Sequence, residues 1–574
     1  MKIRAIISAA FAVCAAIVIG AVGYSHFGGG EEQVGDRVRT FENYTQIEQV
    51  LSGIKEEPPI VYATGSEPVE DLSEAPPLMS NGEAAAEKSA EHSDTYLQVE
   101  GVDEADIIKS DGQYIYYTSR MGSGVIIAEV ADGKAEAVAE ISEEELGITA
   151  ENLFLTADRL VVTGMEFDDS EGHYVPTRAM VTAACVYDVS DPKKPEFIGK
   201  YRQTGGYVSA RVTGRYLYLI STDYLNTGEQ RIVPSAGADE NYDKLPANHI
   251  CCFPKPDRKA YAVIGSVKVD SAKGRLKADT RAVLGASDSI YCSGSAIYMP
   301  DYRLDFDDPA AVSAKEHTTI MKANISKGRI AFAAHGVVKG RIKDQFSMDE
   351  RDGFFRVAAT DFVNGKNVNY LYVLDENLKT IGKVKGFAKG EEIKAVRYIG
   401  HMAYVITYRQ TDPLFVIDLS DPQAPEMLGS VKITGFSLLL VPEGEDKLIG
   451  IGTATSEEEI GEVEDGVKIA LFDIRDPLEP KVLESMEYKN RASDVQYDHR
   501  ALTVNGREGW YAIPYYSWDD DRGGVLQFRE AGGKLEEMGD YEAEQGIDRC
   551  LFIDDHIYGL ESYEDKIISW KRAH

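Results

Sequence analysis

From residue 95 onward, apolar and polar residues alternate in short runs that are separated by Gly, Asp, Asn and Pro. The runs are rich in Tyr, Val and Ile, and no long stretch repeats its apolar residues at helical spacing. Alternation with a period of two predicts half-buried β-strands, and the separating residues are typical of tight turns. The pattern therefore predicts an all-β domain that covers residues 95–574.

A two-strand unit recurs along this domain, with a short strand, a tight polar turn and a second apolar strand. Nine copies are visible, at 106–119, 152–164, 208–221, 288–301, 347–360, 393–408, 437–453, 495–516 and 548–562. They begin about every 55 residues on average. A repeat of this length with four strands per unit is typical of a β-propeller blade.

A second repeated phrase marks the other half of the unit. It reads "VYDVSDPKKPEFIG" at 186–199, "LFVIDLSDPQAPEMLG" at 414–429 and "LFDIRDPLEPKVLE" at 471–484. Ser and Asp side chains bond to nearby backbone amides, and Pro fixes the backbone angle that a turn needs. We interpret the phrase as the turn between the third and fourth strands of a blade, and not as a functional site.

The last unit contains three strands, and we predict that "TYLQVE" (95–100) supplies the fourth and closes the ring. Closed propellers usually have between about four and eight blades. We therefore predict a β-propeller of about eight four-stranded blades, with nine, the literal count of units, as the alternative.

The N-terminus has a different pattern. Lys2 and Arg4 precede an apolar run at 5–24, and about 20 apolar residues are enough to span a bilayer as a helix. We favour an uncleaved signal anchor over a signal peptide that is cleaved after Gly23. Residues 1–26 form this segment in either case, and the rest of the chain is expected outside the cytoplasm.

Residues 27–94 are predicted to form a flexible stalk between the membrane segment and the propeller. Apolar residues in 37–57 recur near helical spacing and predict a short amphipathic helix. The following residues are rich in Pro, Glu, Ala and Ser, which is typical of a disordered linker. We assign the helix to the stalk, with a docking element as the alternative.

Net charge and cysteine content argue against several classes of binding partner and against stabilisation by disulfides or zinc. The chain has 95 Asp and Glu against 61 Lys and Arg, a formal net charge of −34, which disfavours nucleic acids and anionic lipid surfaces. One of the six cysteines lies in the N-terminal segment, and the other five include no C-x-x-C pair. Neither a disulfide framework nor a zinc site is indicated. A single bridge from Cys251 or Cys252 to Cys292 stays open.

Several longer segments carry a family resemblance. The stretch "TYLQVEGVDEADIIKSDGQYIYY" (95–117) resembles the opening signature of exported bacterial and archaeal proteins with a C-terminal β-propeller domain, distantly related to WD-repeat propellers. Further matching segments are 344–360, 369–391, 408–429 and 471–480. The resemblance covers most of 95–574 and implies a propeller, an exported location and an N-terminal anchor or signal. It implies no established activity, substrate or catalytic residue.

Two acidic clusters are the candidates for chemistry, because no G-x-S-x-G, P-loop or H-E-x-x-H motif is present. The first stands before the first hairpin, and its candidate binding residues are Glu100, Asp103, Glu104 and Asp106. The second is a weaker candidate for a metal site and contains Asp301, Asp305, Asp307 and Asp308. Several converging carboxylate oxygens suit Ca²⁺, and no other cofactor is expected.

The resulting hypothesis is a binding or scaffold protein outside the cytoplasm. A monomeric ring, attached to the membrane only through its N-terminal segment, would present loops on one face to an envelope protein, peptide or glycan. The insertions at 222–258 and 302–316 are expected to decorate that face. The alternative is an extracytoplasmic hydrolase or lyase that uses carboxylates near the channel, with Asp103 and Glu104 as the residues to test.

Overall fold

The computed structural model describes residues 38–54 and 91–573, apart from 123, 167–179, 226–231, 254–255, 257, 306–314, 409–411, 434, 459–460 and 520. The predicted membrane segment and the acidic linker at 58–90 lie outside the described residues. No helix in the described part is long and apolar enough to cross a membrane.

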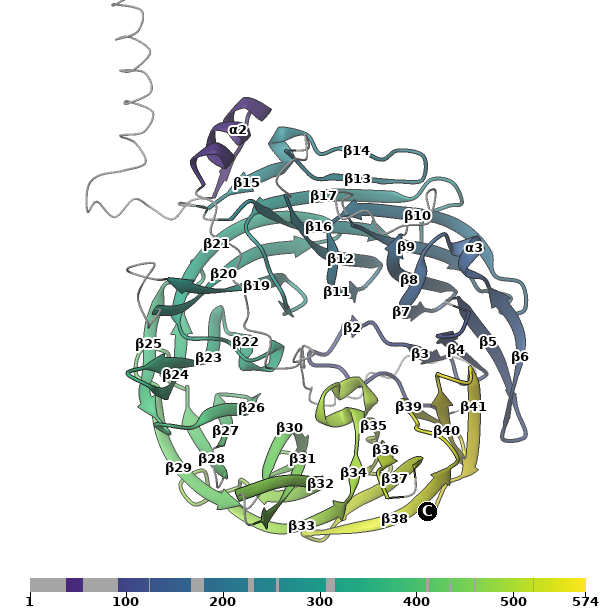
Figure 1. Cartoon of the computed structure of the whole chain (residues 1–574), viewed down its shortest axis with the longest axis vertical. Coiled ribbons are helices and arrows are strands. Elements are labelled where there is room, and N and C mark those ends of the chain that lie inside the picture. Colours follow the sequence, from purple (N-terminus) through teal and green to yellow (C-terminus); the bar gives the residue numbers. More distant parts are fainter. Residues whose placement is uncertain are drawn as a thin grey trace, which may run out of the picture.

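Nine β-sheets are arranged as a ring around a central channel (Figure 1). Eight of them contain four or more strands, which confirms the prediction of four-stranded blades, and the last one contains three. We number the sheets as blades 1 to 9 in chain order. The first strand of each blade lies next to the channel and the last strand at the rim.

The strands of each blade follow one another in the chain as antiparallel neighbours. Blades 1 and 2 contain β3 (Ile108–Ser110), β4 (Tyr114–Thr118), β5 (Val125–Ala131), β6 (Lys134–Ile141), β7 (Thr149–Thr156), β8 (Arg159–Glu166), β9 (Val181–Asp188) and β10 (Glu196–Thr204). Blades 3 and 4 contain β11 (Gly206–Thr213), β12 (Tyr216–Tyr224), β16 (Ala260–Lys268), β17 (Lys277–Leu284), β18 (Tyr291–Cys292), β19 (Ala296–Asp305), β20 (Lys315–Ser326) and β21 (Arg329–Lys339).

The second half of the ring repeats this arrangement. Blades 5 and 6 contain β22 (Met348–Arg351), β23 (Phe354–Val363), β24 (Lys366–Leu374), β25 (Thr380–Phe387), β26 (Glu392–Ile399), β27 (Met402–Tyr408), β28 (Asp412–Asp418) and β29 (Glu426–Ile433). Blades 7, 8 and 9 contain β30 (Phe436–Glu443), β31 (Lys447–Glu458), β32 (Gly461–Asp473), β33 (Lys481–Lys489), β34 (Arg491–Ala492), β35 (Thr503–Asn505), β36 (Trp510–Ser517), β37 (Arg522–Ala531), β38 (Lys534–Ala543), β39 (Arg549–Ile553), β40 (His556–Glu561) and β41 (Lys566–Lys571).

The elements outside the regular blades are short. They are β1 (Arg39–Thr40), α2 (Tyr44–Gly53), β2 (Val102–Glu104), α3 (Glu143–Leu146), β13 (Ser235–Ala238), β14 (Asp243–Lys244), β15 (Ile250–Cys252), and the 3₁₀ turns η1 (Ala247–His249), η2 (Gln345–Ser347), η3 (Asp494–Gln496) and η4 (His499–Ala501).

The hydrophobic core is divided among the interfaces between neighbouring blades. One cluster joins Tyr404, Ile406 and Leu414 of blade 6 to Leu440 and Phe472 of blade 7. Because the middle strands are covered on both faces, they read as continuous apolar runs in the sequence. Each fully buried Leu or Phe side chain contributes on the order of 1.5–3 kcal/mol to the free energy of folding.

The repeated Asp–Pro phrase forms the predicted turn between the third and fourth strands. In blade 2, the Asp188 carboxylate accepts hydrogen bonds from the backbone N–H and the hydroxyl of Ser190, at 3.0 and 2.6 Å. In blade 6, Asp418 accepts the equivalent pair from Ser420, at 2.8 and 2.6 Å. The interpretation of the phrase as a structural turn is therefore confirmed.

The prediction that residues 95–100 supply the fourth strand of the last blade is wrong. Residues 95–100 form no strand, and residues 91–93 instead pair with β39, the innermost strand of blade 9. The N–H of Ser93 donates to the carbonyl of Phe552 at 3.0 Å, and His92 and Ile553 form a bridge. The pairing ends after these few residues because the chain then turns away along the channel wall.

This departure produces the inner belt, which we define as residues 91–107. Tyr96 packs against the core between blades 7 and 8, and Gln98 donates to the carbonyl of Gln345 at 2.9 Å, just before blade 5. Val99 packs against the clusters of blades 3 to 5. The strand β2 then pairs with β11 of blade 3, and Asp106 forms a bridge with Leu153 of blade 2. The belt thus contacts the ring from blade 9 back to blade 1.

The predicted amphipathic helix is present as α2, and it is docked on the ring. The Asn43 side chain caps it by accepting from the N–H of Gln46 at 3.1 Å. Ile47 and Leu51 are buried in a cluster with residues of blade 3 and its insertion. The adjacent β1 pairs with β15. The docking alternative therefore describes residues 39–54 better than a free stalk does.

The described part of the insertion at 222–258 extends the outer edges of two blades and does not cover the face of the ring seen in Figure 1. In its described part, β13 pairs with β10 of blade 2, and β15 lies parallel to β17 of blade 3. The expectation that this insertion decorates a binding face is wrong. Most of the other insertion, residues 306–314, lies outside the described residues.

Candidate functional site

The belt carboxylates are paired with cations on the innermost strands of the blades. Glu104 lies 3.2 Å from the guanidinium of Arg211 on β11. It also lies 3.4 Å from Nε2 of His499, which comes from η4. Glu104, Arg211 and His499 are all buried. Carboxylates buried inside a protein need such partners, because the loss of hydration is otherwise costly.

Burial alone would raise the pKa of Glu104, but the neighbouring charges of Arg211 and His499 outweigh it. The pKa of Glu104 is therefore held below its usual value, and the group is ionised at neutral pH. The same balance holds for Asp498, whose pKa is lowered by Arg500 and Arg549 against the effect of burial. Both carboxylates act as fixed negative charges.

Two further belt carboxylates have partners of the same kind. Asp106 lies 3.0 Å from Nε of Arg549 on β39, and both residues are buried. Asp103 lies 2.9 Å from Nζ of Lys109 on β3. Lys109 also donates to the carbonyl of Glu104 at 2.7 Å. These ion pairs tie the belt to blades 1, 3 and 9.

Of the four predicted binding residues, Asp103, Glu104 and Asp106 thus lie inside the channel as partners of arginine and lysine. Glu100 is the exposed member, and it lines a cavity at the channel. The sequence placed the four residues in one segment correctly, but it did not indicate their partners. Their role in ligand binding stays a prediction.

The second acidic cluster does not come together in the described structure. Asp301 accepts a hydrogen bond from Arg303 at 2.6 Å and is buried. Asp305 ends β19, and Asp307 and Asp308 lie outside the described residues. Within the described ranges, no group of three or more His, Cys, Asp or Glu side chains is placed to hold a metal ion.

The five described cysteines are buried as free thiols, so the bridge to Cys292 that the sequence left open is not formed. Burial raises the pKa of Cys185 to about 12 and that of Cys292 to about 11. Since the thiolate is the reactive form, these cysteines have a structural role in the core.

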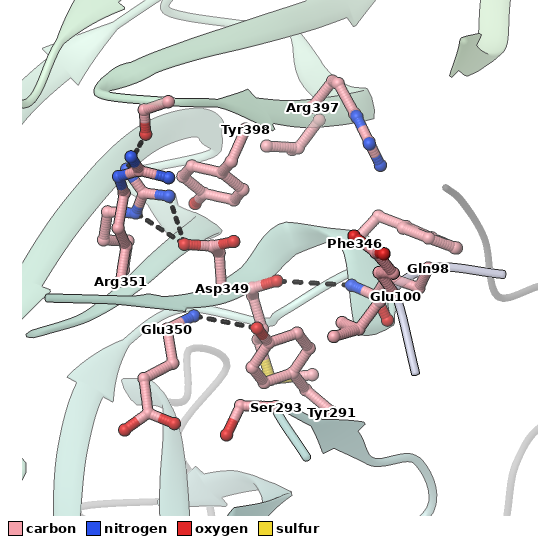
Figure 2. Close-up of a pocket in the computed structure, with 15 residues that line it drawn as sticks. Gln98, Glu100, Tyr291, Ser293, Phe346, Asp349, Glu350, Arg351, Arg397 and Tyr398 are labelled. Carbon is pink, nitrogen blue, oxygen red and sulfur yellow. Dashed lines mark hydrogen bonds and ion pairs between the residues drawn. The ribbon is translucent and has the colours of Figure 1, made fainter. Parts of the chain in front are cut away.

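A cavity of about 270 Å³ lies where the belt passes blades 4, 5 and 6 (Figure 2). Its lining residues come from the belt, from β18, β22, β23 and β26, and from the turns beside them. They are Gln98, Val99, Glu100, Tyr291, Ser293, Phe346, Met348, Asp349, Glu350, Arg351, Arg356, Val396, Arg397, Tyr398 and Gly400. The lining combines three aromatic rings with charges of both signs.

One wall of the cavity is held by a closed set of hydrogen bonds. Arg356 donates from Nε to Asp349 at 2.7 Å and to the carbonyl of Gly400 at 2.8 Å. Its guanidinium lies 4.9 Å from the centre of the Tyr398 ring. The Tyr398 hydroxyl donates to the carbonyl of Ser347 at 3.2 Å. This wall is therefore rigid, and its arginine is satisfied by the protein itself.

The family assignment follows from the chain as a whole. A family model described as "Beta propeller domain" matches residues 92–571, which are the residues that form the belt and the nine blades. The chain belongs to the β-propeller domain family.

Two archaeal proteins are similar to this β-propeller protein along most of the chain. An uncharacterised protein of Archaeoglobus fulgidus is 27% identical and covers 98% of each chain. An uncharacterised protein of Methanocaldococcus jannaschii is 26% identical, over 85% of this chain and 83% of its own. Among solved structures, the periplasmic gluconolactonase of Pseudomonas aeruginosa has a TM-score of 0.33 and 10% identity, over 54% of this chain and 92% of its own. A likeness at that score carries no argument about activity.

Sequence reasoning missed Arg397 in this β-propeller. It lies on β26, the innermost strand of blade 6, and is 6% exposed. Four of the described innermost strands carry a buried cationic side chain. These residues are Lys109, Arg211, Arg397 and Arg549. A charged residue inside the apolar run "KAVRYIG" is a signal that could have indicated it.

Sequence reasoning also missed the place of His499. It lies in η4, inside the channel, with its Nε2 toward Glu104 and its Nδ1 3.9 Å from Asp498. The ring packs edge-on against Phe346 at 5.3 Å between centroids. Its environment is set by residues far away in the sequence, which local patterning does not show.

Proposed function

We propose that this β-propeller protein acts outside the cytoplasm as a binding protein that holds one unit of a peptide or glycan at the mouth of its channel. The observation that carries the proposal is the cavity beside blades 4 to 6, which combines aromatic rings and charged groups in a preformed, rigid wall. Pockets of this composition are typical of small polar ligands.

The size of the cavity limits the ligand. Its volume of about 270 Å³ lies near the lower end of the roughly 300–1,000 Å³ that ligand pockets usually have. A single sugar ring or one or two amino-acid residues suits this space. A longer chain would place one unit in the cavity and extend outward.

Binding is favoured over turnover because of how the nearby carboxylates are held. A general acid or base must exchange a proton with its substrate, and its pKa is best near the working pH. Asp349 is instead held by Arg356, and the pKa of Glu104 is lowered by Arg211 and His499 against the effect of burial. Asp349 thus positions Arg356, and Glu104 keeps its charge.

The location rests on the N-terminal pattern. A basic flank and an apolar run at 5–24 support export and attachment to the membrane through that segment alone. The strongly acidic composition supports a soluble, monomeric ring outside the cytoplasm.

The test is a binding and turnover screen with the purified full-length protein in mild detergent. Monosaccharides, disaccharides and dipeptides are titrated by calorimetry, and the same samples are assayed for products. We expect saturable binding of at least one probe without turnover. Absence of binding across the panel contradicts the proposal, and turnover favours the hydrolase or lyase alternative.

A matched pair of variants localises the site. Ser293 lines the cavity, whereas Ser295, two residues away in the same turn, is exposed outside it. We expect Ser293→Trp to fill the cavity and abolish binding, and Ser295→Trp to leave binding unchanged. Equal binding by both variants would place the ligand elsewhere on the ring.

A further inference from the structure

The cations on the innermost strands differ in one respect that concerns the cavity. Lys109, Arg211 and Arg549 each pair with a carboxylate of the belt, at distances of 2.9 to 3.2 Å. Arg397 is as deeply buried as these three, but it forms no hydrogen bond or ion pair with any described residue. Figure 2 shows its guanidinium without a dashed contact, on the side of Phe346 and Glu100.

A second buried arginine, Arg356, shows that the cavity does contain acceptors that can satisfy an arginine. Both arginines line the same cavity and both are buried. Arg356 has its charge satisfied by Asp349 and by the carbonyl of Gly400. The Nε of Arg397 is buried without an acceptor, and so is the hydroxyl of Tyr96, whose charge interactions include Arg397.

Burial lowers the pKa of Arg397 to about 10, so the group still carries its proton at neutral pH. A buried cation without a partner is unfavourable, and native proteins keep such groups mainly where a ligand or a reaction needs them. Among the described residues, Arg397 thus feels the charge of Asp349 but has no carboxylate in direct contact, and it lines a cavity that a ligand can enter.

We propose that Arg397 binds a carboxylate group of the ligand. This inference rests on the proposed function and specifies the chemical class of the ligand as a carboxylate, carried either by an acidic sugar or by the free C-terminus of a peptide. The planar guanidinium matches a carboxylate with two parallel hydrogen bonds.

The other charges of the cavity favour a carboxylate over a phosphate. Asp349, Glu350 and Glu100 also line the cavity, and their negative charges repel an anion with two charges more strongly than an anion with one. The rings of Tyr291, Phe346 and Tyr398 also line the cavity and offer apolar surface to a ligand. A compact monoanion with an apolar side meets both conditions.

The test compares matched probes that differ only in the carboxylate. Galacturonate is titrated against galactose, and the dipeptide Ala-Ala against its C-terminal amide, with inorganic phosphate as a further probe. We expect the acid of one pair to bind and its neutral partner to bind roughly ten- to a hundredfold more weakly, as for loss of a charged hydrogen bond. The two pairs distinguish the sugar from the peptide source.

Variants of Arg397 complete the test. Arg397→Gln should weaken the acid probe to the level of the neutral one, and Arg397→Lys should restore part of the affinity because it keeps the charge but loses the planar geometry. Glu100→Gln should keep or strengthen the affinity, since it removes a negative charge beside the site. The control is Arg215→Gln, which removes the same charge from an exposed arginine on blade 3 and should leave the affinity unchanged.

Stability separates a binding role from a structural one. Since Arg397 has no hydrogen-bond or ion-pair partner among the described residues, Arg397→Met should keep or raise the melting temperature while it abolishes binding of the acid. A lower melting temperature would overturn the proposal. So would equal binding of acid and neutral probes, or preference for phosphate, and in these two cases the proposed binding function stands. Failure of every probe to bind contradicts both proposals.

Discussion

At the scale of single residues, arginines organise the interior of the channel. Arg549 lies within 3.3 Å of carboxylate oxygens of Asp106 and Asp494, and it also pairs with Asp498. It therefore joins the belt to η3 and to the residue that caps η4. Removing one member of a buried ion pair leaves the other charges uncompensated, which is the costly case.

We expect Arg549→Met to lower the free energy of unfolding by about 3–5 kcal/mol, because three carboxylates lose a common partner. The measurement is the urea midpoint of the full-length chain. Arg507→Met serves as the control, since the Arg507 side chain is 79% exposed and pairs with Glu91 at the surface. That change should cost less than about 1 kcal/mol. Equal shifts in both variants would argue against the network.

The carboxylates whose pKa values are lowered also make the stability of the ring sensitive to acid. Burial raises the pKa of Glu104 and of Asp498, but arginines reverse this and hold both pKa values below those of the unfolded chain, which are near 4. The stability from these pairs is therefore complete at neutral pH and is lost as the pH falls below about 4.

The check is the melting temperature between pH 7 and pH 3. Glu104→Gln should start from a lower melting temperature at pH 7, and it should lose less on acidification because one titrating group is gone. A slope identical to that of the unchanged protein would show that Glu104 does not contribute to acid lability.

At the scale of elements, the repeated turn connects neighbouring blades. A Cβ added at Gly429, on the outer strand of blade 6, would lie 2.5 Å from the carbonyl oxygen of Leu478 in the turn of blade 7. Gly382 faces Pro422 in the same way, one blade earlier. In blades 6 and 7, the turn thus packs against a glycine on the outer strand of the preceding blade.

We expect Gly429→Ala to lower the free energy of unfolding by about 1–3 kcal/mol, since backbone must move to admit the methyl group. The matched control is Gly53→Ala at the end of α2, where an added Cβ meets nothing within 4 Å. Chemical denaturation of both variants decides the question, and a harmless Gly429→Ala would contradict the packing described.

The elements that sequence patterning predicted are those that depend on near neighbours. The hairpins and the Asp188 and Asp418 turns follow from residues two to a few positions apart. The belt depends instead on pairs such as Asp106 with Arg549, which are 443 residues apart. Arg397 could not be predicted for the same reason, since a charge without a partner can be recognised only when the positions of its distant neighbours are known.

At the scale of the whole molecule, the ring depends on the contact between its first and last blades. Apolar side chains of blades 1 and 9 share one cluster, which includes Ile115 and Tyr558. The carboxylate of Asp565 accepts from the hydroxyl of Ser119 at 2.6 Å and from the N–H of Arg120 at 3.1 Å. With three strands in blade 9, this contact has little support from an outer strand.

We expect Asp565→Gly to open the ring at this contact. Asp565 has a φ of 50°, which glycine adopts without strain, so the change mainly removes the carboxylate bonds. Hydrogen exchange should become faster in β3–β6 and β39–β41 together. Asp132→Gly, at a φ of 50° in an exposed turn of blade 1, is the control. Uniform acceleration around the ring, or none, would contradict the expectation.

The course of the inner belt has a consequence for biosynthesis. A ribosome makes the belt before any blade, and then makes blades 1 to 9 in order. Asp106 meets blade 2, β2 meets blade 3, Val99 meets the core of blades 3 to 5, and Ser93 meets blade 9. In this series of backbone and apolar contacts, the later blades therefore contact the belt nearer to its N-terminus. The belt is therefore already synthesised when each of these blades leaves the ribosome, and it offers the blade a contact on which to fold.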